Sequence, residues 1–146
     1  MRAVVQRVTE ARVTVDGAVT GEIGTGLVVL LGIERKDESG EAERLARKVA
    51  QLRIFADEAG RFAHSLVDTA GAALVVSQFT LITDTRGKGN RPDFSNAAPK
   101  PQAQGLYSLF CRTLSDLGVP VETGTFGARM AVELLNDGPV TIILDA

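Results

Sequence analysis

The strongest constraint on the fold is a succession of short, β-branched segments separated by turn residues, with helical spacing of apolar residues in only two places. Apolar runs of about four to eight residues, bounded by glycine, proline, asparagine or aspartate, are typical of strands. Many strands and only two helices predict an α+β fold, a curled, barrel-like, mostly antiparallel sheet with two main helices packed outside it. The length fits one core, so we expect a single domain over residues 1–146.

The expected strands are spread over the whole chain. Leu27–Leu31 is continuously apolar, which predicts a strand buried on both faces. Asp16-Gly17 separates two β-branched runs and predicts a two-residue hairpin, because a type I′ turn needs positive φ at both positions. The other strands are expected at Met1–Thr9, Arg12–Val15, Ala18–Ile23, Ala72–Leu81, Val119–Glu122, Met130–Leu135 and Val140–Leu144, with two short ones inside Phe55–Phe62.

Two segments have helical spacing. Ser39–Arg53 places its apolar residues on one face, with acidic residues early and basic residues late, as the helix dipole favours. Pro101–Leu117 has a similar apolar face, and Gly118 is the expected C-cap. Between them, Thr83–Lys100 is a long polar loop, and loops of this length in a compact domain are often functional.

Charge and composition exclude some classes of protein. The net charge is −2, the aromatic content is 5 %, and there is no tryptophan, so neither a broad basic face nor an extended base-stacking platform is expected. An enzyme that holds only the end of an RNA remains compatible with this balance. The N-terminal stretch lacks the apolar core of a signal peptide, and no run is long enough to cross a membrane. With Cys111 as the single cysteine, we expect a cytoplasmic protein.

The usual catalytic sets are missing from the sequence. His64 is the only histidine and has no obvious partner, and Cys111 lies within a helical pattern, where it is more typical of a core residue than of a nucleophile. One histidine and one cysteine do not favour a metal site, and no phosphate-binding loop is present, so we expect no metal and no cofactor. Any catalysis must then use backbone groups, hydroxyls, amides or the substrate itself.

Three polar segments could supply such groups. Ser77-Gln78-Phe79-Thr80 ends an apolar strand and could donate hydrogen bonds to an oxyanion, although polar residues at a strand end often only face solvent. Asn136–Pro139 is either a hairpin connection or a segment with a cis Gly-Pro bond. The basic loop Arg86–Arg91 is either a phosphate contact or a solvated loop.

Taken together, these segments resemble the D-aminoacyl-tRNA deacylase family over essentially the whole chain. The resemblance rests on blocks that occur in the family's order, namely Met1–Val8, Val76–Leu81, Arg91–Ser95, Glu122–Met130 and Asn136–Ile142. It implies a homodimer with two sites at the interface, acting on the 3′ end of aminoacyl-tRNA. By this resemblance Ser77, Gln78, Phe79 and Thr80 line the pocket around the scissile ester.

The resemblance also assigns the substrate-binding residues. Gly138-Pro139 would be a cis pair that reaches into the partner's site, binds the substrate's amino group and sterically rejects an L side chain. Glycine has no side chain and would escape this filter. Phe126 and Met130 match positions that pack against the terminal adenine, and Arg7 matches a residue near the Gly-Pro segment.

The mechanism implied is hydrolysis of the ester between amino acid and ribose. Thr80 is a possible nucleophile, but no base lies near it in sequence. We therefore favour activation of water by the RNA's own 2′-OH, with an oxyanion hole from the backbone N–H of Phe79 or Thr80 and from Gln78.

The sequence departs from the family around the basic loop. That loop is one residue longer than is common, and Asp93 stands where relatives often have serine. Three rival functions stay open. They are a proofreader of L-alanyl-tRNA on the same scaffold, a binding module for nucleic acid or a replication complex, and a generic esterase.

Overall fold

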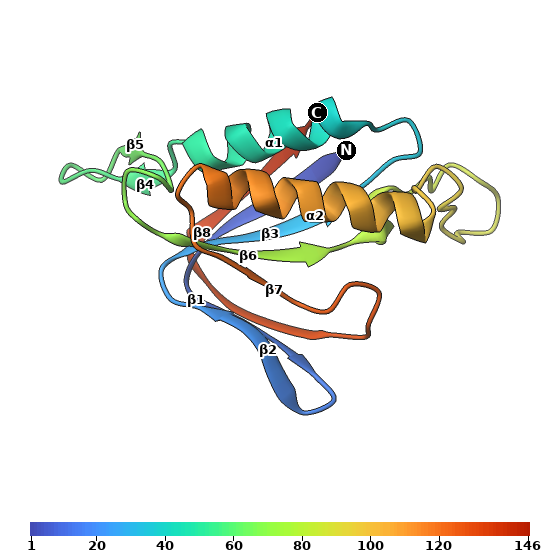
Figure 1. The fold of residues 1–146 in the computed structure, drawn as a ribbon, viewed down its shortest axis with the longest axis horizontal. Helices are drawn as coiled ribbons and strands as arrows, with labels where there is room; N and C mark the ends of the chain where they lie inside the picture. The colour runs from blue at the N-terminus through green and yellow to red at the C-terminus, as the bar shows by residue number, and fades with distance from the viewer.

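The computed structural model describes residues 1–146 and has two long helices on one side of a strongly curved sheet (Figure 1). The strands are β1 (Arg2–Val15), β2 (Ala18–Ile23), β3 (Gly26–Gly32), β4 (Phe55–Ala56), β5 (Phe62–His64), β6 (Ala72–Ser77), β7 (Val121–Thr123) and β8 (Ala131–Asp145). The helices are α1 (Ser39–Gln51), the 3₁₀ turn η1 (Phe79–Leu81) and α2 (Lys100–Asp116). This confirms the α+β prediction.

The main sheet is mixed and almost closes on itself. Its order is β2-β1-β3-β6-β7, with β8 on the other edge of β1. The pairs that involve β1 are antiparallel, whereas β3–β6 and β6–β7 are parallel. Where β2 meets β7, a Cβ added at Gly21 would lie 2.3 Å from the Thr123 carbonyl oxygen. This close approach of the two end strands gives the sheet its predicted barrel-like curl.

Both faces of the central strands are buried. Leu27, Val29 and Leu31 pack into the core that α1 and α2 cover. Val28 points to the opposite face and joins a second apolar cluster with Leu74, inside the curl. The prediction that Leu27–Leu31 is buried on both sides is therefore correct, because the helices cover one face and the curled strands cover the other.

Local signals located the turns and helices well. Asp16 and Gly17 have φ of 49° and 79°, as the two-residue turn requires. Gly118 ends α2 with φ of 89°, a conformation that favours glycine at this position. The observed helices end one or two residues before the predicted ends, Arg53 and Leu117. Neither helix is long and apolar enough to span a membrane.

Three strand boundaries differ from the prediction. The segments Met1–Thr9 and Arg12–Val15 form the single strand β1, because β3 pairs with its first half and β2 with its second half. The last two predicted strands likewise form one strand, β8, which follows β1 along its length. Asn136–Pro139 is therefore not a hairpin connection. The strand predicted at Ala72–Leu81 ends at Ser77, because the chain turns there into η1.

Candidate active site

The segment Ser77–Thr80 lies where a buried parallel strand gives way to a helical turn. Ser77 is the last residue of β6 and pairs with Leu31 of β3. The Gln78 N–H still donates to the Leu31 carbonyl at 2.8 Å, which fixes the exit of the chain from the sheet. Polar groups are thus held at the carboxyl end of a parallel strand, the edge where sheets of this kind commonly bind ligands.

The turn η1 leaves two backbone donors without acceptors inside it. Its first i→i+3 bond runs from the Leu81 N–H to the Gln78 carbonyl at 3.2 Å, and the next from Ile82 to Phe79 at 3.0 Å. The N–H groups of Phe79 and Thr80 precede these bonds and so have no partner within the turn. Two adjacent N–H groups of this kind can bind an oxyanion.

A mostly apolar cavity of about 600 Å³ opens beside this turn. Its volume is in the range of about 300–1,000 Å³ that is usual for small-molecule sites. Five residues predicted from the sequence line it together: Ser77, Gln78, Phe79, Phe126 and Met130. The parts of the wall come from β6, η1, the loop before α2 and the segment before β8, so residues far apart in sequence meet at one place.

Aromatic side chains make two walls of this cavity. Phe79 is 60 % exposed, and its ring packs against that of Phe94 in an edge-to-face arrangement, with the ring centroids 5.1 Å apart. Phe126 packs on Tyr107 at 5.5 Å, and the Tyr107 hydroxyl donates to the Val75 carbonyl at 2.7 Å. Sequence reasoning gave Phe94 no role in the site. Two sequence signals could have found it: it lies in the block Arg91–Ser95 that resembles the family, and it is the one aromatic residue in the polar loop 83–100.

Thr80 has no general base beside its hydroxyl. The Gln78 side-chain amide donates to Thr80 Oγ1, and an amide cannot take the proton of the hydroxyl. Thr80 is exposed and does not line the cavity. His64 lies in β5, and Figure 1 shows the β4–β5 hairpin at the opposite end of the sheet from the loop 83–99. Thr80 is therefore poorly equipped to act as a nucleophile.

Cys111 is also a poor nucleophile. It lies in α2, half-buried against the core, and burial raises the pKa of its thiol to about 11. At neutral pH almost all of the thiol is protonated, and the thiolate is the reactive form. No group of three or more histidine, cysteine, aspartate or glutamate side chains that could hold a metal ion is gathered in the structure.

The Gly138-Pro139 pair lies in a bulge that projects from β8. Opposite Arg7 the register of β1 and β8 slips, so that residues 137–140 face this one residue. The Gly138-Pro139 peptide bond is cis, and both residues are exposed. Gly138 has φ of 152°, and a Cβ there would lie 2.7 Å from the Val140 nitrogen, so only glycine fits without a shift of the backbone.

Two side chains hold this bulge from behind. The Asn136 amide accepts from the Val140 N–H at 2.8 Å and donates to the Val140 carbonyl at 3.1 Å. Arg7 donates to the Asp137 carbonyl at 2.9 Å and to the Ile54 carbonyl at 2.6 Å, with its side chain only 12 % exposed. The backbone of the bulge is thus held by hydrogen bonds from both Arg7 and Asn136.

The predicted site residues therefore fall into two groups. One group, Ser77, Gln78, Phe79, Phe126 and Met130, lines the cavity, and Thr80 lies next to it in η1 with its side chain exposed. The other, Gly138, Pro139 and Arg7, lies on or behind the bulge and does not line this cavity in the same chain.

The chain is similar to several known proteins over nearly its whole length. A family model described as D-Tyr-tRNA(Tyr) deacylase matches residues 4–145. Proteins named D-aminoacyl-tRNA deacylase from Ruegeria pomeroyi and Anaeromyxobacter dehalogenans are each 58 % identical, covering 99 % and 100 % of this chain and 99 % and 97 % of their own.

Two solved structures are also similar. One, of a protein named c-Myc DNA Unwinding Element Binding Protein, is 46 % identical with a TM-score of 0.91, covering 100 % of this chain and 99 % of its own. The other, of a probable eukaryotic D-amino acid tRNA deacylase, is 19 % identical with a TM-score of 0.84, covering 99 % of this chain and 98 % of its own. The second likeness concerns the fold alone.

Proposed function

The chain belongs to the D-Tyr-tRNA(Tyr) deacylase family, and from this we propose that it hydrolyses the ester bond of D-aminoacyl-tRNA, releasing the D-amino acid and tRNA. Such an activity is a chiral proofreading step in translation. The observation that carries the proposal is the cavity at the end of β6, where Ser77, Gln78 and Phe79 meet Phe126 and Met130. Full-length relatives at 58 % identity support the same activity.

In the proposed reaction the protein positions groups and stabilises charge. The backbone N–H groups of Phe79 and Thr80, with the Gln78 amide, bind the oxygen that becomes negative as water attacks the ester. The 2′-OH of the terminal ribose activates that water, because no side chain near Thr80 is a base. The terminal adenine packs against Phe126 and Met130.

The proposed chiral filter comes from a second subunit. The Gly138-Pro139 bulge of one subunit enters the cavity of the other, where its carbonyl oxygens bind the substrate's amino group and occupy the space of an L side chain. Its projection from β8 and its bracing by Arg7 support this role. Within the chain β8 pairs only with β1, and Leu135 and Ile143 on it are 57 % and 63 % exposed, which supports a homodimer.

The direct test is single-turnover hydrolysis of matched D-tyrosyl-tRNA and L-tyrosyl-tRNA by the purified protein. We expect rapid loss of the D ester only. Loss of both esters would keep a deacylase but remove the chiral filter, and loss of neither would overturn the proposal. Glycyl-tRNA(Ala) is an informative third substrate, because glycine should pass the filter. L-alanyl-tRNA and a simple phenyl ester test the rival proofreader and the generic esterase.

A second candidate function is binding to DNA, favoured only by the 46 % identity to the protein named c-Myc DNA Unwinding Element Binding Protein. The net charge of −2 weighs against it, because DNA binding without sequence preference draws on many lysine and arginine contacts to phosphate. A gel-shift titration with duplex and single-stranded DNA decides between them. Tight, salt-sensitive binding without any tRNA hydrolysis would favour the second candidate.

A further inference from the structure

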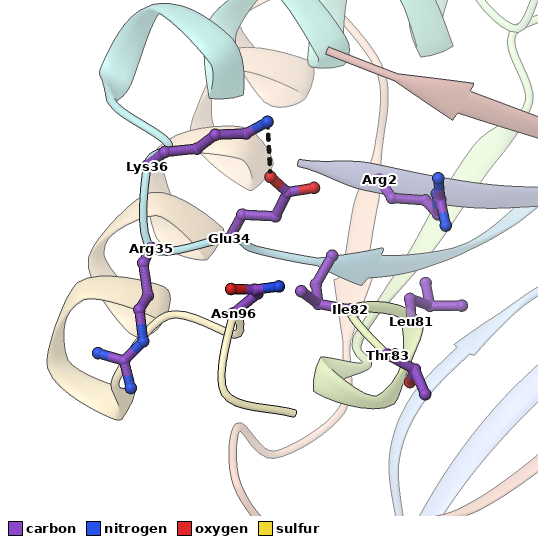
Figure 2. A pocket seen from close by; sticks show the side chains of 8 residues that line it. All are labelled: Arg2, Glu34, Arg35, Lys36, Leu81, Ile82, Thr83 and Asn96. Atoms are coloured by element: carbon purple, nitrogen blue, oxygen red, sulfur yellow. Dashed lines mark ion pairs between the residues drawn. The ribbon is translucent and has the colours of Figure 1, made fainter. Parts of the chain in front are cut away.

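Arg35 lies between two neighbouring cavities. Besides the apolar cavity, it lines a polar pocket of about 410 Å³ on the other side of η1, formed with Arg2, Glu34 and Lys36 among others (Figure 2). Figure 2 shows Lys36 reaching toward Glu34, while the Arg35 guanidinium points away from this pair. Arg35 is thus the only charged residue that both cavities share.

The other cations of the polar pocket are already neutralised. Arg2 pairs with Asp145 at 2.8 Å, and Lys36 pairs with Glu34 at 3.0 Å. Arg35, in contrast, has no carboxylate within 4.0 Å. An anionic ligand would therefore meet an unpaired charge at Arg35 and only paired charges deeper in the polar pocket.

Arg35 is also held in place. Its backbone N–H donates to the Asn96 carbonyl at 3.0 Å, and its carbonyl accepts from the Gln102 side chain at 2.9 Å. Its Nε donates to the Ser95 carbonyl at 2.5 Å, while its two terminal nitrogens make no hydrogen bond within the chain. A guanidinium fixed in this way presents free N–H donors that match the oxygens of a phosphate.

Lys100 brings a second unpaired charge to the same cavity. It is the first residue of α2, it lines the apolar cavity, and it has no carboxylate within 4.0 Å. A Cβ added at Gly127 would lie 3.0 Å from its Nζ, which places the ammonium group beside Gly127, the residue that follows Phe126 in the cavity wall. Arg35 and Lys100 are the only cations among the residues that line this mostly apolar cavity.

We propose that Arg35 and Lys100 form a phosphate subsite that holds the phosphodiester on the 5′ side of the terminal nucleotide. This rests on the proposed function, since it presumes that the terminal adenosine occupies the cavity. With the base against Phe126, a 5′ phosphate needs a cation in the wall of the same cavity, and Arg35 and Lys100 are the two that line it. The subsite anchors the RNA strand and leaves the reacting ester to Phe79 and Gln78.

Nucleotide binding tests this subsite without any hydrolysis. The probes are 5′-AMP and adenosine, whose dissociation constants are measured by NMR titration at low and moderate salt. For the wild type we expect AMP to bind at least about tenfold more tightly than adenosine, since hydrogen bonds to charged groups are worth about that factor or more. The preference should shrink as salt rises, because opposite charges near solvent are screened.

The variants are Arg35→Gln with Lys100→Gln, Arg35→Lys, and the control Arg112→Gln. The double variant should bind AMP and adenosine equally. Arg35→Lys keeps the positive charge but loses the planar pair of guanidinium N–H donors, so part of the preference for AMP over adenosine should remain. Arg112 lies about 18 Å further along α2 and also has no carboxylate partner. Its loss removes one positive charge far from the cavity and should leave the preference intact.

A substrate pair separates this subsite from the proposed function. The 3′-O-D-tyrosyl esters of adenosine and of 5′-AMP carry the same scissile bond with and without the phosphate. If the proposal is right, the double variant loses at least about tenfold in kcat/KM on the AMP ester and keeps wild-type activity on the adenosine ester. Equal binding of AMP and adenosine by the wild type, or equal loss on both esters, would overturn the subsite. Tight AMP binding without hydrolysis of any D ester would overturn the proposed function and leave the subsite standing.

Discussion

The apolar cavity and the Gly138-Pro139 bulge contrast in almost every physical respect. The cavity is concave, lies at the end of the buried strand β6, and is lined by residues of one chain, Ser77 and Phe79 among them. The bulge is convex and exposed, and does not line this cavity. Both features are held by hydrogen bonds. The pairing of β3 with β6 holds the strand end at the cavity, and Arg7 and Asn136 hold the bulge.

Because of this difference, we expect substitutions in the cavity and in the bulge to affect different subunits of a dimer. A change in the cavity should affect the subunit that carries it. A change in the bulge should affect the site of the partner, provided that two copies assemble as proposed.

The largest effect is expected from Gly138→Ala. A new Cβ would lie 2.7 Å from the Val140 nitrogen at a φ of 152°, so the bulge must shift. We expect single-turnover hydrolysis of D-tyrosyl-tRNA to fall by about 100-fold, as a displacement of about 1 Å in a positioning group can cause. Gly24→Ala is the matched control, because a Cβ there meets nothing within 4 Å.

Mixing variants tests whether the bulge acts on the partner. At D-tyrosyl-tRNA concentrations well below KM, Gly138→Ala and the cavity variant Phe126→Ala should each be weakly active, but subunit exchange would create mixed dimers with one intact site. Random pairing should restore about a quarter of wild-type activity. If mixing restores nothing although exchange is shown by mass spectrometry, the bulge serves its own subunit or none.

A smaller loss is expected from Phe126→Ala itself. Removal of the ring takes away a stacking surface for the terminal base, which is worth about 1–3 kcal/mol per base. KM for D-tyrosyl-tRNA should rise by about 10- to 100-fold, with a smaller change in kcat. Phe126→Tyr keeps the ring and should stay near wild type. An unchanged KM for the alanine variant would show that the terminal base does not pack against Phe126.

Arg7→Gln should loosen the bulge without removing it. The variant loses hydrogen bonds to the Asp137 and Ile54 carbonyls, and its side chain is only 12 % exposed. We expect a loss of about 1–3 kcal/mol in the free energy of unfolding and about tenfold in kcat. Urea unfolding and single-turnover rates measure the two effects.

Arg12→Gln is the control on the same strand. Arg12 pairs with Glu133 at 3.0 Å, with both side chains about half exposed. Exposed pairs contribute at most about 1 kcal/mol, so this variant should change neither stability nor rate much. Equal losses in Arg7→Gln and Arg12→Gln would show that Arg7 has no special part in holding the bulge.

The smallest effect is expected from Thr80→Ala. The Thr80 hydroxyl accepts from Gln78 and has no base beside it, whereas the backbone N–H survives the substitution. The single-turnover rate should stay within about threefold of the wild type, as for loss of one weak neutral hydrogen bond. A loss of several orders of magnitude in this rate would indicate that Thr80 is the nucleophile. The protein, and not water activated by the 2′-OH of the substrate, would then supply the attacking group.

Short-range signals in the sequence determined much of this protein. Positive φ at Asp16-Gly17 follows from the residue types of the pair, burial of Leu27–Leu31 on both faces from a continuous apolar run, and the two helices from helical periodicity. The residues of the cavity wall were recognised from motif order, and five of them do share one cavity. Each of these features depends on residues close in sequence or on an ordered set of motifs.

Only the tertiary structure decided how distant segments combine. The end of β6 at Ser77 and the continuity of β1 and β8 depend on which partner strand continues beside them. The proposed phosphate contact of Arg35 could not be predicted from the sequence around it. It rests on the two cavities that Arg35 borders and on the absence of a carboxylate near it in space. Strand register and shared cavities arise from long-range contacts, which a periodic pattern within one segment cannot report.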